Sequence, residues 1–488
     1  MPSSRLEEFA PVFYPKSHAV IGASANGRKF GGRFLQALLN FGYPGRLYPV
    51  NPQESEVLGL TTYRRIGDIP EPVDFASVAV PARAVPGVVA ECLAKGVKGV
   101  QVLSAGFREI SDDGRLLEEE IARIAAKGIR VIGPNCFGIY CPGGGLTILP
   151  GDYLPKDSGN VAFISQSGGY AIRVPRRAEG LGIRFSKVVS YGNACDVNEC
   201  DLLEYFAEDP ETEIVTAYLE GVRDGPRFFR LLKEIGGAKP VIIWKGGLTE
   251  GGARAAHSHT ASLSGEKDVW EAVFRQTAAV PVSGLEELLD TVLAFRHLGE
   301  TAGRRICPVG GGGSIGVAAA DTLERVGLSV PVFPAELQRK LTALIPAAGA
   351  SARNPVDVAN PFPPPPMLRA VLETVCTEAE IDIIIVDEIE MAMVVSREGE
   401  TTRPAALIEE MMQVPVDIKE KYGKPVVSVM PVEAVSRETL ASEGERRKVR
   451  DFLHERGIPV FLTLERAAKA LVNLTGYYRR RAEMRATE

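Results

Sequence analysis

Two of the five histidines in this 488-residue chain, His257 and His259, stand close together in the run GGARAAHSHTASLSG at 251–265. The run is rich in Gly, Ala, Ser and Thr, and no apolar periodicity around the histidines would place them in a core. We therefore predict a loop on which His259 is free to act as a nucleophile toward a phosphoryl group. These residues alone leave open an ordinary surface loop with incidental histidines.

A histidine that takes up a phosphoryl group needs a carboxylate to fix its tautomer and N–H donors to hold the phosphate. Glu220 lies at the end of the predicted strand 213–221, where a parallel sheet places its ligand edge, so its carboxylate can orient His259. The stretch VAFISQSGG runs from a strand into a helix, whose free N–H groups join the hydroxyls of Ser165 and Ser167 in a natural phosphate site. A solvated glutamate at a strand end is the alternative for Glu220.

Apolar strands that alternate with helices predict an α/β fold of doubly wound parallel sheets. Residues 1–145 are predicted to form a Rossmann-type domain, and similar units are predicted at 155–300 and 303–478. The second and third units are predicted to be copies of one fold, because AKPVII at 238–243 is echoed by GKPVVS at 423–428.

The carboxyl ends of the strands in the first domain are expected to form a ligand site. The glycine turn there, GASANGRKFG, departs from GxGxxG, and the second strand ends in Asn51 where an NAD-binding domain carries an acidic residue. NAD is therefore disfavoured and another nucleotide-bearing cofactor is expected, with a purely structural turn as the alternative. The edge residues are Gly22, Ala23, Ser24, Asn51, Pro52, Val80, Pro81, Ser104, Ala105, Gly106, Phe107 and Gly133 to Cys136.

A third glycine turn, RICPVGGGGSIGVAAAD at 305–321, again runs from a strand into a helix. Two such units packed together can direct two helix N-termini at one phosphate, each contributing N–H donors and positive dipole. The alternative is that the glycine run 310–313 serves only as a tight turn.

Charge and cysteine content narrow the class of protein. Lys plus Arg total 56 against 62 for Asp plus Glu, and the basic residues are scattered, which argues against nucleic acid or a membrane as partner. The seven cysteines form no CxxC pair, so neither a disulfide framework nor a metal site is indicated. No run approaches the ~20 apolar residues of a membrane span, and a soluble cytoplasmic protein is expected.

A series of motifs resembles the alpha subunit of the NDP-forming acyl-CoA synthetases, the group that contains ADP-forming acetyl-CoA synthetase and, more distantly, succinyl-CoA synthetase. The motifs are, in chain order, VIGAS, YPVNP, SAGF, GPNC, ISQSGG, YGN, YLEGV, GGARAAHSHTASLSG and NPVD. The resemblance covers nearly the whole chain. It implies a Rossmann-type CoA-binding domain followed by two flavodoxin-like domains of the succinyl-CoA synthetase type, with coenzyme A at the predicted edge and Lys29 added to its site.

The resemblance also implies roles for single residues. His259 matches the histidine that is phosphorylated and Glu220 the glutamate that supports it, whereas His257 matches no known role. The residues implied near the thioester and acyl group are Asn135, Cys136, Gly192 and Asn193. The residues implied at the two helix starts that hold the phosphohistidine are Ser167, Gly168, Gly169, Gly312, Gly313 and Ser314.

The implied reaction is reversible: phosphate attacks the acyl-CoA thioester to give an acyl phosphate and free CoA, and His259 then carries the phosphoryl group to ADP. The chain shows no convincing ATP-grasp region, so a separate beta subunit with the ADP/ATP and Mg²⁺ site is implied, in a hetero-oligomer such as α2β2. The substrate would be a small carboxylic acid or its CoA thioester. Two places depart from the family pattern: Ala261 replaces a glycine in SHTAS, and GGGGS replaces an Asn-Ala-Gly-Gly type of turn.

Two other functions are weighed against this enzyme. A non-catalytic sensor of CoA or acyl-CoA could keep the fold, but the presence of His259 with Glu220 and both glycine turns favours catalysis. A Rossmann oxidoreductase is disfavoured by the missing GxGxxG and by Asn51.

Overall fold

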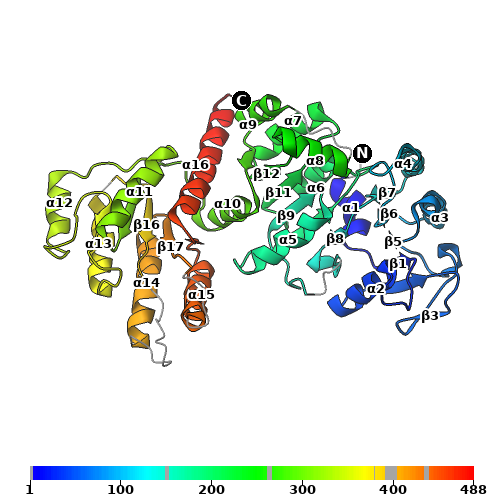
Figure 1. Cartoon of the computed structure of the whole chain (residues 1–488), viewed down its shortest axis with the longest axis horizontal. Coiled ribbons are helices and arrows are strands. Elements are labelled where there is room, and N and C mark those ends of the chain that lie inside the picture. Colours follow the sequence, from blue (N-terminus) through cyan, green and yellow to red (C-terminus); the bar gives the residue numbers. More distant parts are fainter. Residues whose placement is uncertain are drawn as a thin grey trace. The chain divides into compact units, whose positions relative to one another are not determined.

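The structure is a computed structural model that describes residues 4–148, 153–260, 266–378, 380–390, 404–432 and 439–487, apart from the side chains of 256–260, 313–315 and 487. The chain divides into two compact units, Met1–Leu285 and Glu286–Glu488 (Figure 1). Within the described ranges, no helix is both long and apolar enough to cross a bilayer.

The first unit begins with a five-stranded parallel sheet in the order β2-β1-β5-β6-β7. Its strands are β1 (Ser17–Ile21), β2 (Arg46–Val50), β5 (Phe75–Val78), β6 (Gly99–Val102) and β7 (Arg130–Ile132). Its main helices are α2 (Phe30–Phe41), α3 (Val85–Lys95) and α4 (Asp112–Ala125), and a small hairpin is formed by β3 (Glu56–Val57) and β4 (Leu60–Thr61). The chain changes direction across the sheet between β1 and β5, and such a switch point opens a crevice at the carboxyl ends of the strands.

The first unit also contains a six-stranded sheet in the order β13-β12-β11-β9-β10-β8. Its strands are β8 (Gly138–Tyr140), β9 (Val161–Ser165), β10 (Phe185–Ser190), β11 (Ile214–Leu219), β12 (Val241–Lys245) and β13 (Val280–Val282). Its helices are α5 (Gly168–Glu179), α6 (Glu199–Glu208), α7 (Gly225–Gly236), α8 (Glu250–Thr260) and α9 (Lys267–Gln276). Only β8 is antiparallel within this described sheet, so the segment that ends the predicted first domain pairs with β10 of the second sheet.

The second unit is built on a five-stranded parallel sheet in the order β15-β14-β16-β17-β18. Its strands are β14 (Ile306–Gly310), β15 (Val356–Asp357), β16 (Ile383–Asp387), β17 (Val426–Val429) and β18 (Val460–Phe461). Its helices are α10 (Leu285–Leu298), α11 (Gly313–Arg325), α12 (Ala335–Thr342), α13 (Pro365–Glu378), α14 (Ala405–Tyr422), α15 (Leu440–Glu455) and α16 (Leu464–Thr487).

The three sheets share one strand order. With β8 set aside, the strands of each sheet lie in the order 2-1-3-4-5 when they are numbered along the chain. The two echoing segments of the sequence form β12 and β17, which are the fourth strands of their sheets. The predicted doubly wound parallel fold and the repeat between the later units are therefore confirmed.

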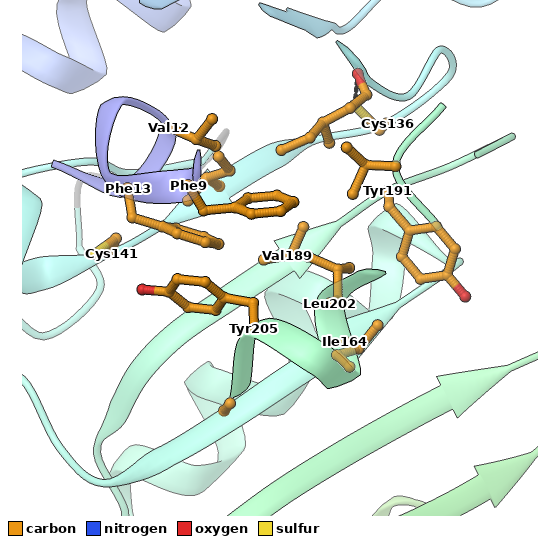
Figure 2. Close-up of a cluster of buried hydrophobic side chains, with 14 of the residues drawn as sticks. Phe9, Val12, Phe13, Cys136, Cys141, Ile164, Val189, Tyr191, Leu202 and Tyr205 are labelled. Atoms are coloured by element: carbon orange, nitrogen blue, oxygen red, sulfur yellow. Dashed lines mark hydrogen bonds between the residues drawn. The ribbon is translucent and has the colours of Figure 1, made fainter. Parts of the chain in front are cut away.

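One hydrophobic core joins the two sheets of the first unit (Figure 2). Helix α1 (Arg5–Phe13) precedes the first sheet, yet its Phe9 and Phe13 pack on Tyr205 of α6, with ring centroids 5.5 and 4.6 Å apart. The same cluster continues to Ile164 of β9 and Val189 of β10. Burial of each Phe stabilises this joint by about 1.5–3 kcal/mol, and the joint fixes the loops of one sheet against those of the other.

Ion pairs reinforce the same joint. The guanidinium of Arg130, on β7, pairs with Asp196 at 3.0 Å and also with Glu8 of α1. Lys187 of β10 is fully buried, and its ammonium pairs with Asp209 at 2.9 Å and Glu211 at 2.7 Å. A buried charge that loses its partner is strongly destabilising, so these pairs hold the joint in one arrangement.

The prediction of a loop at 251–265 is wrong for its first part, because Glu250–Thr260 form helix α8. The Thr249 hydroxyl accepts a hydrogen bond from the Gly252 N–H at 3.1 Å and so caps the helix start. The helix-favouring alanines in ARAAHSH outweigh the flanking glycines, which the sequence interpretation took as loop formers. Residues 261–265 and the side chains of His257 and His259 lie outside the described residues.

Two histidines stack inside the second unit. The rings of His297 on α10 and His454 on α15 have centroids 5.7 Å apart and planes inclined by 12°. Burial, together with the nearby cationic Arg296, lowers the pKa of His297 to about 3 and that of His454 to about 4. Both rings are therefore neutral at pH 7, and His454 Nε2 accepts a hydrogen bond from the Val460 N–H at 3.1 Å.

We expect the second unit to lose stability as the pH falls below about 6.5, the ordinary histidine pKa. Below that value the unfolded chain protonates His297 and His454, whereas the folded chain keeps them neutral until its own lowered pKa values are reached. Linkage gives about 1–2 kcal/mol lost per histidine between about pH 6.5 and 5. Calorimetry of the full chain should show His297→Phe, which keeps a stacked ring, with a shallower decline than the wild type.

The first unit supplies the internal control for that experiment. Both tryptophans, Trp244 and Trp270, lie in it, so unfolding followed by tryptophan fluorescence reports on this unit. The first unit contains the buried His18, whose pKa is lowered by burial to about 3, so the stability of this unit also falls with falling pH. The variant His297→Phe leaves that fall unchanged. Identical pH dependence of every transition in the wild type and the variant would contradict the prediction.

Candidate active site

A cavity of about 670 Å³ opens at the carboxyl ends of β1, β2 and β5, at the switch point of the first sheet. The predicted edge residues that line it are Gly22, Lys29, Asn51, Pro52, Val80 and Pro81. Six predicted residues do not line the cavity: Ala23, Ser24, Ser104, Ala105, Gly106 and Phe107. Of these, Ser24, Ser104, Gly106 and Phe107 make hydrogen bonds that hold the surrounding loops.

Asn51 stabilises the glycine turn beside the cavity. Its Nδ2 donates to the Ala23 carbonyl at 2.6 Å, so the amide that replaces the expected acid at this strand end ties β2 to the turn after β1. The same turn is held by Glu54, whose carboxylate accepts from the Ser24 hydroxyl at 2.6 Å and from the Ala25 N–H at 2.7 Å. Glu54 was missed by the sequence analysis because it lies in the loop after the strand end.

Charged side chains give the cavity a positive character. Lys29, Arg64, Arg65 and Glu91 line it, and Arg65 pairs with Glu91 at 2.6 Å. An excess of cations at a switch point suits a ligand that carries phosphate groups. Phe30 and Val88 add apolar surface on which a ring can lie. The adjacent Arg64 and Arg65 are a sequence signal that the strand-end analysis did not use.

The loop after β6 is folded around Glu109. Its Oε1 accepts from the Gly106 N–H at 2.7 Å and from the Phe107 N–H at 3.1 Å, while the Ser104 hydroxyl donates to the Val80 carbonyl at 2.5 Å. Phe107 is buried in the core, so it anchors the loop rather than meeting a ligand. These bonds fix the predicted loop 104–107 against the end of β5.

The amide of Asn193 connects this loop to the second sheet. Its Nδ2 donates to Glu109 Oε2 at 2.6 Å and to Glu118 Oε2 at 3.1 Å, so both of its N–H groups are used by carboxylates. Its Oδ1 consequently faces Asn135, whose Nδ2 lies 3.4 Å away. Burial raises the pKa of Glu118, while its pairing with Arg108 opposes that shift. Glu109 and Glu118 were missed because their contacts cross from one sheet to the other.

The backbones of the two loops also touch. Gly192 has φ +53°, and a Cβ on it would lie 2.2 Å from the Pro134 carbonyl oxygen, so only glycine fits there. Cys136 is 4% exposed and its thiol donates to the Val102 carbonyl at 3.3 Å. Burial raises the pKa of that thiol to about 12, so Cys136 is a protonated core residue and not a nucleophile.

The second sheet supplies a buried carboxylate next to a helix start. Glu220, directly after β11, is 5% exposed, and its Oε1 accepts from the Tyr218 hydroxyl at 3.2 Å. Gln166, in the turn between β9 and α5, accepts from the N–H groups of Glu220 and, at 3.0 Å, Gly221. The predicted Glu220 and the predicted turn at Ser167 to Gly169 are therefore neighbours, joined by one side chain.

The turn before α5 is held by a hydrogen bond within it. The Ser165 hydroxyl donates to the Ser167 carbonyl at 2.7 Å, and Ser167 is the N-cap of α5. In the described structure the Ser167 side chain does not cap the helix, which leaves N–H donors at Gly168 and Gly169 available to an anion. Gly312 is likewise the N-cap of α11, in the second unit, where Gly313 begins the helix.

The structure thus assembles part of the predicted site within the first unit. The cavity, the loop 104–107 and Asn193 form one connected region, and Glu220 adjoins the start of α5. Contact of His259 with Glu220, and the pairing of the two helix starts, stay predictions.

Comparison with known families gives one match for each of the two sheets of the first unit. Residues 16–142 match a family described as a CoA binding domain, and residues 158–295 match a succinyl-CoA ligase like flavodoxin domain. Over 468 residues the chain is 36% identical to the alpha subunit of acetate–CoA ligase [ADP-forming] I from Pyrococcus furiosus, a match that covers 94% of this chain and 96% of that subunit.

Two further relatives extend the comparison. Acetate–CoA ligase [ADP-forming] I of Archaeoglobus fulgidus is 38% identical over 77% of this chain, and the match spans about half, 54%, of that longer protein. The solved structure of the dinucleotide forming acetyl-coenzyme A synthetase 1 of Ca. Korarchaeum cryptofilum, in complex with phosphate and ADP, superposes with a TM-score of 0.83 at 31% identity and covers 98% of both chains.

We expect Gly192→Ala to destabilise the first unit by roughly 2–4 kcal/mol, because the new Cβ meets the Pro134 carbonyl as well as a strained φ. Gly182→Ala is the matched control: its φ is +67° but no atom lies within 4 Å of the new Cβ, so it should cost only about 1 kcal/mol. Denaturant unfolding followed by tryptophan fluorescence measures both. Equal losses for the two variants would show that the loops do not touch at Gly192.

Proposed function

The chain belongs to the family of the ADP-forming acetate–CoA ligases, and we propose that it acts as the alpha subunit of an ADP-forming acid–CoA ligase. The reaction interconverts acyl-CoA, ADP and phosphate with a carboxylic acid, CoA and ATP. The observation that carries the proposal is the connection, through Asn193, of a cationic cavity on a CoA-binding domain to the sheet that bears Glu220. Relatives over nearly the whole chain are named as ligases, which favours catalysis over a CoA sensor.

Coenzyme A suits the residues of the first sheet. The cations Lys29 and Arg64 suit its phosphates, and the apolar wall with Phe30 suits the adenine. The pantetheine arm would then run along the loop 104–107 toward Asn135 and Asn193, where the Asn193 Oδ1 is turned to accept a hydrogen bond. Cys136 would support this place from the core, where its thiol donates to the Val102 carbonyl.

The proposed chemistry has two transfers on this chain. Phosphate attacks the thioester carbonyl, the C–S bond breaks, and CoA leaves as a thiolate with an acyl phosphate as product. A nitrogen of His259 then attacks phosphorus, and the acid leaves with the electron pair of the O–P bond. Glu220 stabilises the imidazole cation that results, and the N–H groups at Gly168 and Gly169 hold the phosphate, with Gly312, Gly313 and Ser314 proposed as the second helix start.

A partner completes the reaction. We infer a beta subunit with an ATP-grasp site for ADP/ATP and Mg²⁺, in a hetero-oligomer such as α2β2. The existence of a partner subunit is supported by relatives named as alpha subunits. The acid is a small carboxylic acid. All seven cysteines are free thiols, which suits a reducing cytoplasm.

Phosphorylation of His259 is the test of this function. The chain co-expressed with a candidate ATP-grasp partner should take up the γ-phosphate of labelled ATP in the presence of Mg²⁺, as an acid-labile and base-stable adduct. His259→Ala should abolish the label and His257→Ala should retain it, because only His259 is proposed to attack phosphorus. Absence of label in the wild-type complex, with CoA binding intact, would overturn the proposal and favour the sensor.

Arg64→Ala tests the CoA site separately. Loss of a charge-assisted contact to phosphate should raise the Kd and KM for CoA by roughly 5- to 30-fold with little change in kcat. Arg115→Ala, which removes an exposed arginine of α4 outside the cavity, is the matched control. Titration calorimetry with CoA and steady-state kinetics give the answer, and an unchanged CoA Kd in Arg64→Ala would place the phosphates elsewhere.

A further inference from the structure

The backbone of Glu220 is fixed from both sides by side chains of neighbouring elements. Gln166 accepts a hydrogen bond from its N–H, and the Lys245 ammonium, at the end of β12, donates to its carbonyl at 2.8 Å. Lys245 also donates to the Gly246 carbonyl and lies over the Trp270 ring at 5.3 Å. These contacts hold the peptide groups around Glu220, but none of them turns its carboxylate.

The carboxylate is reached by the residue two positions earlier. Side chains at i and i+2 of a strand point to the same face, so Tyr218 and Glu220 lie side by side at the end of β11. The Tyr218 hydroxyl donates to Glu220 Oε1 at 3.2 Å, and both side chains are buried. Burial, together with the nearby Glu220 charge, raises the pKa of Tyr218, so its hydroxyl stays protonated and remains a donor.

Three contacts place the Tyr218 ring. Tyr170, in the first turn of α5, and Trp244 on β12 pack against it, with ring centroids 4.6 and 4.9 Å away. Gly246 leaves the room that the hydroxyl needs, because a Cβ there would lie 2.8 Å from the Tyr218 oxygen. A donor that is clamped in this way can select one orientation of the carboxylate at small entropic cost.

We propose that Tyr218 is a positioning residue that aims the Glu220 carboxylate at the imidazole of His259 during phosphoryl transfer. The inference rests on the proposed function. As the N–P bond forms and the O–P bond to the acid breaks, the imidazole keeps the proton on its other nitrogen and becomes a cation. A carboxylate held in place stabilises that cation, and the Tyr218 hydroxyl holds the Glu220 carboxylate in its place.

The test follows phosphoenzyme formation in the full chain assembled with its ATP-grasp partner, with phosphorus-labelled acetyl phosphate as the phosphoryl donor. Tyr218→Phe keeps the ring and removes the donor, and we expect it to slow labelling roughly 10- to 100-fold, the usual effect of a hydrogen bond to a charged group. The loss should lie in the rate at saturating acetyl phosphate, with the KM for acetyl phosphate within about twofold of the wild type, because Tyr218 acts through Glu220 and does not contact the phosphoryl donor. A purely structural role would disturb the donor site as well and raise that KM.

Two further variants provide a second test of this hydrogen bond and a control. Gly246→Ala crowds the Tyr218 hydroxyl without removing it, so it should reproduce both the slower labelling and the unchanged KM for acetyl phosphate. Tyr48→Phe, in the first sheet, removes the hydroxyl of another buried tyrosine that donates to a carboxylate, that of Glu71 at 3.0 Å, so it should label within about twofold of the wild type. Thermal unfolding and CoA affinity confirm that each variant is folded.

The outcomes separate this inference from the proposed function. A wild-type complex that takes up no label overturns the proposed function and this inference with it. A wild type that labels normally, with Tyr218→Phe equal to it in rate at saturating acetyl phosphate, overturns the role of Tyr218 alone.

Discussion

The contact on which the site depends is the amide of Asn193 held between Glu109 and Glu118. Each carboxylate uses one N–H of the amide, so the orientation of this side chain is set by hydrogen bonding alone. Glu109 at the same time folds the loop 104–107 through two backbone N–H groups. The buried Glu118 and the half-buried Glu109 therefore position the loop 104–107 of the first sheet and Asn193 of the second sheet together.

This contact needs two sheets that do not move against each other, and the joint around α1 provides that. Phe9 and Phe13 of α1 pack on Tyr205 of α6. Arg130 and Lys187 form ion pairs, with Asp196 and Asp209, beside the same core. The strands of each sheet, apart from the antiparallel β8, run parallel, so their carboxyl ends lie at one edge, and the order 2-1-3-4-5 sets the switch point at that edge. Packing supplies the rigidity, and topology decides which side chains meet.

Sequence patterns predicted the parts of this arrangement that follow from local periodicity. Apolar runs ending in glycine gave the strands and the helix starts, and strand ends gave Asn51 and Glu220 as edge residues. The rest depends on contacts between distant residues. Glu109 carries no local signal, since its partner Asn193 lies 84 residues away, and the burial of Cys136 cannot be read from GPNC. Helix α8 was missed because propensity and capping by Thr249 outweigh flexible neighbours.

Buried polar groups at the strand ends cost stability, and the way they are satisfied indicates what they are for. Glu220 and Lys245 are both almost inaccessible to solvent, and burial lowers the pKa of Lys245 to about 8 even beside a carboxylate. Apolar residues of similar volume would stabilise the same place at least as well. A fold that keeps an acid and a clamped tyrosine there instead holds a preorganised carboxylate, which the proposed transfer through His259 requires, and preorganisation of that kind lowers a transition state more than it stabilises the resting protein.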